Sequence, residues 1–505
     1  MPDGKNPRRC RVGNRGYRGV HAVAASPCGC AIVAPVDTPV AEIERLFHGM
    51  RAAYLRDPMP PLALRKDRLR RLLDLIEQHE DELASAISAD FGNRSLFETE
   101  MAGVVTSIAE IRHTLRHLRR WMRPRHVPTP LYLFPARARI ETQPVGVVGI
   151  ISPWNFPLFL SIPPATGALA AGNRVLLKPS ELTPHFGELL QALVAARFSA
   201  DEFRVVLGAR DVGEALTRLP LNHLFFTGST TVGRAVAQAA AQNLTPTTLE
   251  LGGKSPAILG SGIDSRLGDA ARSIAYGKLL NAGQACTAPD YVFVPRALLR
   301  PFVNQLSATA AALYPDSANN AQYTSLIDQR GWERLMAHLE EVRGAGTEVI
   351  TVGEMNSAAR RMPLHLVIDP PVTSALMRHE IFGPVLPLIA YDSLAQVIAR
   401  INAGPRPLAL YFFGDNRREQ RLVLDRTVSG GVTLNDTMWH IAHPNLPFGG
   451  AGDSGHGAYH GEYSFRRFSH EKAVLVQSRW AASPLLHPPY GRAAKLTLKL
   501  LRKLV

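Results

Sequence analysis

The chain has 505 residues, of which 46% are apolar and 20% charged, a composition typical of a globular protein with two or three domains. Its net charge of +14 comes from the ends, because residues 1–36 hold six Lys or Arg and one Asp, and residues 478–505 hold six and no acid. Subtracting these from the totals of 57 basic and 43 acidic residues leaves 45 and 42 in 37–477. A body so close to neutral argues against a nucleic-acid partner.

Residues 1–36 precede the first regularly patterned segment. Five arginines followed by a mildly apolar stretch imitate a targeting segment, but polar residues and glycine interrupt that stretch. We predict a disordered extension, with targeting as the open alternative. Three of the four cysteines, Cys10, Cys28 and Cys30, lie here, and they predict neither a disulfide framework nor a metal site. The chain has no run of about 18 apolar residues, so no transmembrane segment is predicted.

Helices and then alternating strands and helices are predicted in the body. Apolar residues at helical spacing indicate helices over 40–56, 62–90 and 96–122, and an extended segment follows over 131–142. Strands are then predicted over 144–151, 173–178, 203–207, 223–227 and 247–251, and helices over 161–171, 184–197 and 232–242. A second alternating series covers about 257–435, with strands near Tyr291, Val385, Leu408 and Val432. These series predict an α/β fold with a doubly wound parallel sheet.

The C-terminal tail, 481–505, is basic and amphipathic. Lys495, Lys499 and Arg502 fall on one helical face, with leucines opposite. Such a helix is too short to span a bilayer, but it could lie on an anionic membrane surface. A frayed basic helix without a partner is the alternative.

Cys286 is the only cysteine of the body, in the stretch Asn281-Ala282-Gly283-Gln284-Ala285-Cys286-Thr287-Ala288-Pro289-Asp290. Covalent acyl chemistry needs a nucleophile, a donor for the oxyanion and a base for the hydrolytic water. A thiolate adds readily to a carbonyl carbon, and the small neighbours of Cys286 leave room for a substrate. An isolated cysteine is more often an inert apolar filler, so the neighbouring motifs decide.

Two further residues suit this chemistry. Glu250 ends an apolar strand and precedes Gly252 and Gly253, where partial desolvation would raise its pKa and make it a base near neutral pH. Asn155 lies in the run Pro153-Trp154-Asn155-Phe156-Pro157, and a neutral amide on a rigid turn can donate to an oxyanion. Without Cys286, both would be read as an ordinary strand end and an ordinary turn.

A glycine turn opens the helix after the strand over 223–227. Gly228, Ser229 and Gly233 lie in this turn, whose backbone donors and helix N-terminus could receive a pyrophosphate. The pattern alone is weak, because many helices begin after a glycine turn, and no G-x-G-x-x-G motif follows any strand. Five histidines crowd 440–470, but they lack ligand spacing, and no metal site is predicted.

Together these stretches resemble the aldehyde dehydrogenase superfamily over about 40–477. The carrying motifs are I-S-P-W-N-F-P at 151–157, E-L-G-G-K-S-P at 250–256, G-Q-A-C at 283–286 and the glycine-rich signature at 447–461. The last two take the form of the class 3 branch, and the chain is most similar to the coniferyl aldehyde dehydrogenase group. The resemblance implies Cys286 as nucleophile, Glu250 as base and Asn155 as oxyanion donor.

The same resemblance implies how a cofactor is held. Lys178 and Glu181 would bind the adenine ribose, Glu380 and Phe382 the nicotinamide ribose and ring. Trp154 and Ser180 belong to the same implied set of cofactor-binding residues. A carboxylate near the ribose suits a free 2′-hydroxyl, so NAD is favoured and NADP is left open.

The resemblance also implies a domain plan. A Rossmann-like NAD-binding domain would comprise 37–130 and 144–253, and an α/β catalytic domain 254–442. Small β bridging segments, 131–143 and 443–480, would join two copies, so a homodimer is expected. We also expect a cytoplasmic location.

The substrate is the least determined point. The resemblance favours an aromatic aldehyde such as a hydroxycinnamyl aldehyde, and Met438-Trp439-His440 would line the entrance. Those bulky residues suit an alkyl chain equally well, so a medium- or long-chain aliphatic aldehyde is the first alternative. CoA-acylating dehydrogenase, a reductase, and a catalytically silent structural or membrane-surface protein on the same scaffold are the others.

Overall fold

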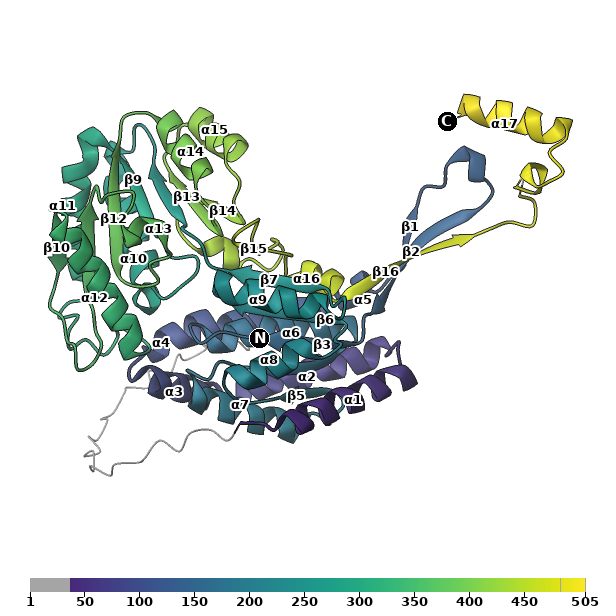
Figure 1. Ribbon diagram of the computed structural model, residues 1–505, viewed down its shortest axis with the longest axis horizontal. Coiled ribbons are helices and arrows are strands. Elements are labelled where there is room, and N and C mark those ends of the chain that lie inside the picture. The colour runs from purple at the N-terminus through teal and green to yellow at the C-terminus, as the bar shows by residue number, and fades with distance from the viewer. Residues whose placement is uncertain (1–36, 482, 505) are drawn as a thin grey trace, which may run out of the picture. The chain divides into compact units, whose positions relative to one another are not determined.

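The computed structural model describes residues 37–481 and 483–504 (Figure 1); the predicted extension, 1–36, therefore lies outside the described residues. The described chain forms three sheets, of six, seven and three strands. This agrees with the predicted α/β fold.

Helices form the first part of the body. They are α1 (Val40–Arg56), α2 (Leu62–Gln78), α3 (Glu80–Phe91), α4 (Leu96–Thr99), the π-helical turn η1 (Glu100–Val105) and α5 (Thr106–Trp121). The single helix predicted over 62–90 is wrong, because His79 leaves the helical region with φ −130° and ψ 28° and separates α2 from α3. The helix predicted over 96–122 also contains the π-helical turn, which the apolar spacing did not indicate.

The six-stranded sheet has the order β15-β7-β6-β3-β4-β5, parallel except for β15. Its strands are β3 (Val147–Ile151), β4 (Arg174–Lys178), β5 (Phe203–Val205), β6 (His223–Gly228), β7 (Thr247–Leu251) and β15 (Gly455–His456). Its helices are α6 (Pro157–Ala171), α7 (Pro184–Arg197), α8 (Arg210–Arg218) and α9 (Thr230–Ala241). Alternate residues of β3 bury themselves in cores on opposite faces: Val148 and Ile150 on one, Val147 on the other.

Two boundaries around this sheet differ from the predictions by three or four residues, and one helix was not predicted. The first predicted strand begins at Val147 rather than Pro144, because Gly146 adopts φ 137° and breaks the extended run. The first predicted helix begins four residues early, at Pro157, which occupies the first helical turn where a missing N–H costs nothing. Helix α8 was not predicted.

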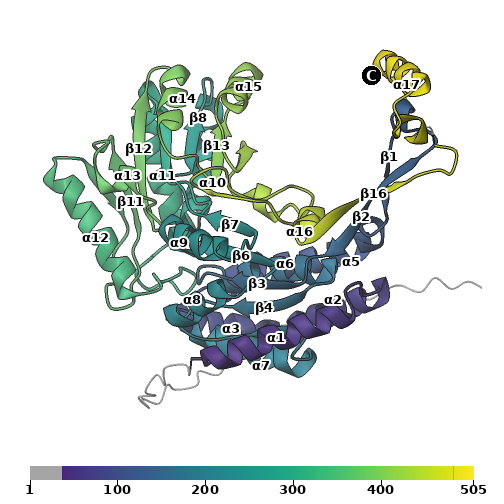
Figure 2. The same ribbon diagram turned by 45° about the vertical axis from the view of Figure 1, so that its right-hand side comes forward.

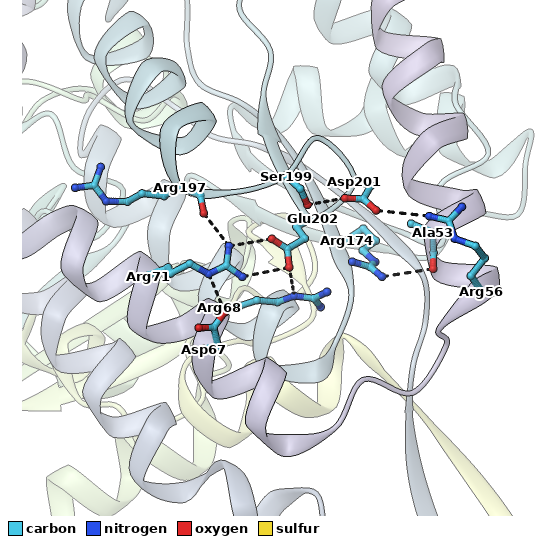
Figure 3. A network of polar contacts seen from close by, with 10 residues as sticks. All are labelled: Ala53, Arg56, Asp67, Arg68, Arg71, Arg174, Arg197, Ser199, Asp201 and Glu202. Atoms are coloured by element: carbon cyan, nitrogen blue, oxygen red, sulfur yellow. Dashed lines mark hydrogen bonds and ion pairs between the residues drawn. The ribbon is translucent and has the colours of Figure 1, made fainter.

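A network of charged side chains fastens the helical lead-in to this sheet (Figure 3). Glu202, beside β5, accepts hydrogen bonds from Arg68 and Arg71 of α2. Burial would raise the pKa of Glu202, but these two arginines outweigh burial and lower the pKa to about 2. Arg174 of β4 donates to the carbonyl of Ala53 in α1. These contacts hold α1 and α2 against the six-stranded sheet.

The seven-stranded sheet has the order β10-β11-β12-β9-β8-β13-β14, and only β10 is antiparallel. The strands are β8 (Pro256–Leu259), β9 (Tyr291–Pro295), β10 (Val349–Val352), β11 (Leu364–Ile368), β12 (Val385–Tyr391), β13 (Ala409–Phe413) and β14 (Gly431–Leu434). The helices are α10 (Leu267–Leu279), α11 (Leu299–Leu313), α12 (Gln329–Gly344), α13 (Ala375–Arg378), α14 (Leu394–Ala403) and α15 (Arg417–Arg426). Short 3-10 turns are η3 (Asp264–Arg266), η4 (Leu280–Gly283), η5 (Arg296–Leu298) and η6 (Trp439–Ala442).

The three-stranded sheet has the order β1-β2-β16, from β1 (Arg125–Val127), β2 (Arg137–Pro144) and β16 (Ser469–Val476). The extended segment predicted over 131–142 is only partly extended, because Leu131–Leu133 form the 3-10 turn η2. Of the segment 443–480, only β16 joins this sheet. The other parts belong elsewhere: β15 pairs with β7, and α16 (Gly461–Arg467) packs against α6.

The tail contains the 3-10 turn η7 (Ser483–Leu486) and α17 (Arg492–Leu504), which lies beside η2 in both views (Figures 1 and 2). No helix among the described residues is long and apolar enough to cross a membrane.

Candidate active site

Residues of five distant segments line one cavity of about 410 Å³. Its walls include Cys286, Glu250, Asn155, Trp154, Gly228, Ser229, Glu380 and Phe382. Four of these eight lie at or beyond the carboxyl ends of β3 and β6, where the parallel strands of a doubly wound sheet present their ligand-binding loops. The structure thus brings the three predicted catalytic residues together.

The loop that carries Cys286 has an unusual backbone. Asn281, Ala282 and Gly283 have φ values of 53°, 51° and 73°. A Cβ on Gly283 would lie 2.5 Å from the carbonyl oxygen of Gly383, so no larger residue fits there. The conformation ends α10 and turns the following residues into the cavity.

Cys286 is the only cysteine of the described residues, and its side chain is partly exposed. Burial raises the pKa of the thiol, and the carboxyl groups of Glu380 and Glu250 raise it further. The backbone N–H groups of Cys286 and Thr287 hydrogen-bond to the sulfur and oppose that rise. Burial and the two carboxyl groups thus favour the neutral thiol over the thiolate, and backbone N–H donors near a sulfur can also stabilise a negative oxygen.

Glu250 lies in β7 with its side chain in the cavity wall. Burial raises its pKa well above the ordinary value for a carboxyl group. Neither carboxyl oxygen has a hydrogen-bond partner among the described residues. A buried acid without partners can exchange a proton with a bound water or substrate.

Asn155 is buried, and several groups fix its orientation. Its Nδ2 donates to the carbonyl of Gln284 at 3.1 Å. The backbone carbonyl of Asn155 accepts hydrogen bonds from Arg94 Nη1 at 2.5 Å and from Asn281 Nδ2 at 3.0 Å. An amide nitrogen carries two hydrogens, so one remains for a bound oxygen.

Sequence reasoning missed Glu98, a buried residue of α4 that binds the loop carrying Cys286. Its carboxyl group accepts from the backbone N–H of Asn281 at 3.2 Å, from Thr324 Oγ1 at 2.9 Å and from Tyr314 Oη at 3.0 Å. Burial raises the pKa of Glu98, while Arg94 and these hydrogen bonds lower it. No motif marks Glu98, and only its contacts with the loop single it out.

A second cavity, of about 750 Å³, adjoins the first over the edge of the six-stranded sheet. Lys178, Ser180 and Glu181 line it together with Gly228, Ser229 and Trp154. Lys178 is buried, and its Nζ donates to Glu181 Oε2 and to the carbonyl of Pro179, both at 3.1 Å. The volume and polar lining fit the adenosine part of a dinucleotide.

Residues of the glycine turn serve two different purposes, as Ser229 and Gly233 show. Ser229 Oγ accepts from the N–H of Val232 and caps α9, so this helix N-terminus faces the second cavity. Gly233 lines neither cavity. A Cβ there would lie 2.5 Å from the Leu251 side chain, so this glycine allows α9 to pack closely on β7.

Glu380 and Phe382 lie across the first cavity from this turn. Burial, with Asp290 nearby, raises the pKa of Glu380 to about 8, and its Oε1 has no partner among the described residues. A Cβ on Gly252 would lie 1.8 Å from Glu380 Oε2, so a larger residue there would displace the Glu380 carboxyl group. The Phe382 ring meets the Trp154 ring edge to face, with centroids 5.4 Å apart. An unpaired carboxyl and an aromatic edge fit the ribose and ring of a nicotinamide.

A third cavity, of about 100 Å³, shares Cys286 and Leu160 with the first. Its lining is almost wholly apolar and includes Phe156, Phe159, Tyr276, Met438 and Trp439. No charged residue of the described chain lines it. His440 does not line it either, contrary to the prediction, because it is buried and hydrogen-bonded to Thr433.

The described residues hold no cluster of three or more His, Cys, Asp or Glu suited to a metal ion.

Comparisons with known proteins agree with this geometry. The aldehyde dehydrogenase family model matches residues 31–474. The chain is 46% identical to a probable coniferyl aldehyde dehydrogenase of Pseudomonas aeruginosa over 91% of this chain and 96% of that one. It is 44% identical to a coniferyl aldehyde dehydrogenase of a Pseudomonas species over 88% and 93%.

Solved structures give the same result. A substrate-bound AldH of Staphylococcus aureus superposes with a TM-score of 0.86 at 35% identity, over 91% of this chain and 99% of that one. An aldehyde dehydrogenase of Mycobacterium tuberculosis complexed with NAD+ superposes with a TM-score of 0.79 at 27% identity, over 87% and 91%. The predicted family resemblance is confirmed, and the chain belongs to the aldehyde dehydrogenase family as an NAD(P)-dependent enzyme that oxidises aldehydes.

Proposed function

We propose that this enzyme oxidises an aromatic aldehyde of the hydroxycinnamyl type to its carboxylic acid, with NAD as cofactor and Cys286 as nucleophile. The observation that carries the proposal is the placement of Cys286, where the apolar third cavity meets the cavity lined by Glu250, Asn155 and Glu380. A substrate from one side and a cofactor from the other would meet at the sulfur.

The residues suggest a sequence of steps. The Cys286 thiolate adds to the aldehyde carbon, and Asn155 Nδ2 with the backbone N–H of Cys286 holds the resulting oxyanion. When bound, NAD would accept the hydride that leaves the former aldehyde carbon as the oxyanion collapses, and this step leaves a thioester on Cys286. Glu250 then removes a proton from water, which attacks the thioester, and the acid leaves as the thiolate re-forms.

Lys178, Ser180 and Glu181 would hold the adenine ribose, with Gly228 and Ser229 near the pyrophosphate. NAD is proposed over NADP because the Glu181 carboxylate lies in the second cavity, where it suits a hydroxyl and repels a phosphate. A ratio of kcat/KM for NAD to that for NADP above about ten would support this choice.

The aromatic substrate rests on the aromatic lining of the third cavity and on the names of the two Pseudomonas relatives. The uncharged lining also supports the second candidate, a medium- or long-chain aliphatic aldehyde. NADH formation should therefore be screened against cinnamyl, benzyl and medium-chain aldehydes. A higher kcat/KM for the alkyl series would replace the first candidate by the second.

The test of the mechanism is Cys286→Ala. This variant should lose aldehyde-dependent NADH formation, by at least about a thousandfold, because no second thiol exists in the described site. Its NAD affinity, measured by quenching of tryptophan fluorescence, should stay within about twofold of the parent enzyme. Turnover at the parent rate would refute Cys286 as the nucleophile.

We further propose the predicted domain plan, a cytoplasmic location and a homodimer joined through the three-stranded sheet. The outer edge of β16 pairs with no other strand of the described chain, and most of its side chains are exposed. A long free edge of this kind is normally covered. Light scattering that gives twice the mass of 55.1 kDa would support the dimer. The predicted peripheral membrane contact of the tail belongs to the same set of proposals.

A further inference from the structure

Two segments far apart in the sequence combine into one apolar surface beside α17. We name it the tail surface and define it by ten exposed side chains: Leu131, Tyr132, Phe134, Trp480, Leu485, Leu486, Tyr490, Leu496, Leu498 and Leu500. Contacts of α17 with both η2 and η7 bring them together, and both views place α17 beside the loop between β1 and β2 (Figures 1 and 2). Exposed apolar side chains gathered around one helix in this way indicate a binding surface.

Helix α17 separates its charged and apolar residues cleanly. At 3.6 residues per turn, its five cations fall within an arc of roughly 100°; they are Arg492, Lys495, Lys499, Arg502 and Lys503. Leucines flank that arc, and the most exposed of them, Leu496 and Leu500, expose 70% and 59% of their surface. A single helix with this division lies flat at an interface between water and an apolar phase.

The cations of α17, beside the tail surface, have no acidic partners among the described residues. Residues 478–505 contain six Lys or Arg and no acid, and none of the five cations of α17 forms an ion pair with the described residues. Its natural partner is therefore anionic as well as apolar. Another copy of this chain fits poorly, because its tail would bring the same positive charge and its body is nearly neutral.

The aromatic residues point to the same kind of partner. Trp480 and Tyr490 expose 76% and 69% of their surface, and Phe134 exposes 67%. The amphipathic rings of Trp and Tyr sit at the depth of lipid headgroups, between water and the acyl chains, and the apolar ring of Phe134 adds to the inserted area.

We infer that the tail surface docks the enzyme on an anionic lipid bilayer, with α17 lying in the plane of the headgroups. Thirteen helical residues extend only about 20 Å, so the helix rests on the bilayer rather than crossing it. The inference goes beyond the proposed aldehyde oxidation, because the ten residues of the tail surface line none of the three cavities.

The experiment is flotation of the full-length chain with vesicles. Vesicles of phosphatidylcholine alone are compared with vesicles that contain about 30% phosphatidylglycerol. The enzyme should float with the anionic vesicles and not with the neutral ones, and salt should weaken binding as the Debye length shortens. Failure to bind anionic vesicles at low salt would overturn the inference.

Two double variants separate the contributions. Lys495→Glu with Lys499→Glu should lower the bound fraction by at least about tenfold, since each basic residue near the surface adds attraction. Leu496→Ser with Leu500→Ser should lower it by removing the inserted side chains. The matched controls are on α15, where Arg417→Glu with Arg418→Glu and Leu422→Ser with Leu424→Ser alter similarly exposed residues. Equal loss in a control and its test pair would contradict the assignment to the tail surface.

Two parallel readouts identify the outcome. If the leucine variant fails to bind vesicles and also changes from dimer to monomer in light scattering, a second copy is the occupant and the lipid assignment is overturned. Oxidation of a water-soluble aldehyde should be unchanged in all four variants, so a failure of lipid binding leaves the proposed catalytic function intact.

Discussion

Glu250 is an acid whose two carboxyl oxygens have no hydrogen-bond partner among the described residues, in the same cavity wall as Cys286. If its task is to activate the hydrolytic water, Glu250→Gln should still form the thioester but should release it slowly. We expect one equivalent of NADH in a burst, followed by a steady rate at least about a hundredfold below the parent. Stopped-flow absorbance of NADH measures both phases.

The surface variant Glu77→Gln, in α2, serves as the control for this prediction. A Glu250→Gln enzyme with an undiminished steady rate would show that another group activates the water. Because burial raises the pKa of Glu250, the acidic limb of the parent's pH profile for deacylation should lie above the ordinary carboxyl range, and rates should fall as pH decreases through it.

Some residues of the site stand in recognisable sequence motifs, and others are identified only by their contacts in the structure. Cys286, Glu250 and Asn155 stand in compact motifs, because the chemistry needs each beside small or rigid neighbours, and the structure places all three in one cavity. Glu98 and Arg94 have no such neighbours, and their contacts join segments up to 226 residues apart. Local pattern does not carry that information.

Glu98 links helix α4 to the loop that carries Cys286. The carboxyl group binds the N–H of Asn281, whose backbone has positive φ, so loss of the acceptor should let the loop relax and shift Cys286. Glu98→Ala should lower the single-turnover rate about a hundredfold, the cost of a displacement of about 1 Å, with NAD affinity little changed. Rapid-quench or stopped-flow single-turnover measurements report this rate.

Glu98→Gln retains an acceptor oxygen and should recover part of the rate. Thr324→Val and Tyr314→Phe each remove one donor to Glu98 and leave the bond to Asn281 intact, so their effects should be smaller. If Glu98→Ala lost activity only in proportion to lost folded protein, the residue would be structural and not a positioning residue.

At the level of elements, alternating apolar strands and intervening helices predicted the cofactor-side sheet well. Strand β4 was placed within one residue, and β7 matched its predicted bounds, because each is a short, mostly apolar run in a regular alternation of strands and helices. The break at His79 was missed, since no Gly or Pro interrupts the apolar spacing of α2 and α3. Turn η2 was missed because the helix that it contacts, α17, is distant in the sequence and its contacts leave no local pattern.

At the scale of the whole molecule, stability depends on pH through buried groups such as His223. Its Nε2 is 2.9 Å from Thr248 Oγ1, and burial lowers its pKa to about 3. The unfolded chain, with a histidine pKa of about 6.5, binds the proton first as pH falls, so this contribution is present above about pH 6.5 and is lost below it. Between pH 7.5 and 5.5 the loss is about 1.4 kcal/mol.

His223→Gln cannot take up that proton. The difference in unfolding free energy between the parent and this variant should therefore shrink by about 1.4 kcal/mol from pH 7.5 to 5.5. Urea denaturation at the two pH values measures it. His126→Gln, on the exposed side of β1, is the control and should show no such change. An equal difference at both pH values would contradict the depressed pKa of His223.

The tail stands apart from the rest of the molecule energetically. Over 492–503, where burial is described, only Ala494 of α17 is buried. The main contacts of the helix are with η7 and η2. Removal of 481–505 should therefore leave the midpoint of urea denaturation within experimental error and kcat for a water-soluble aldehyde within about twofold. It also removes five positive charges, so the truncated enzyme should elute earlier from a cation exchanger. A large fall in kcat would instead mean that the tail shapes the route to Cys286 in the assembled enzyme, and the fall should then be reproduced by Leu496→Ser with Leu500→Ser.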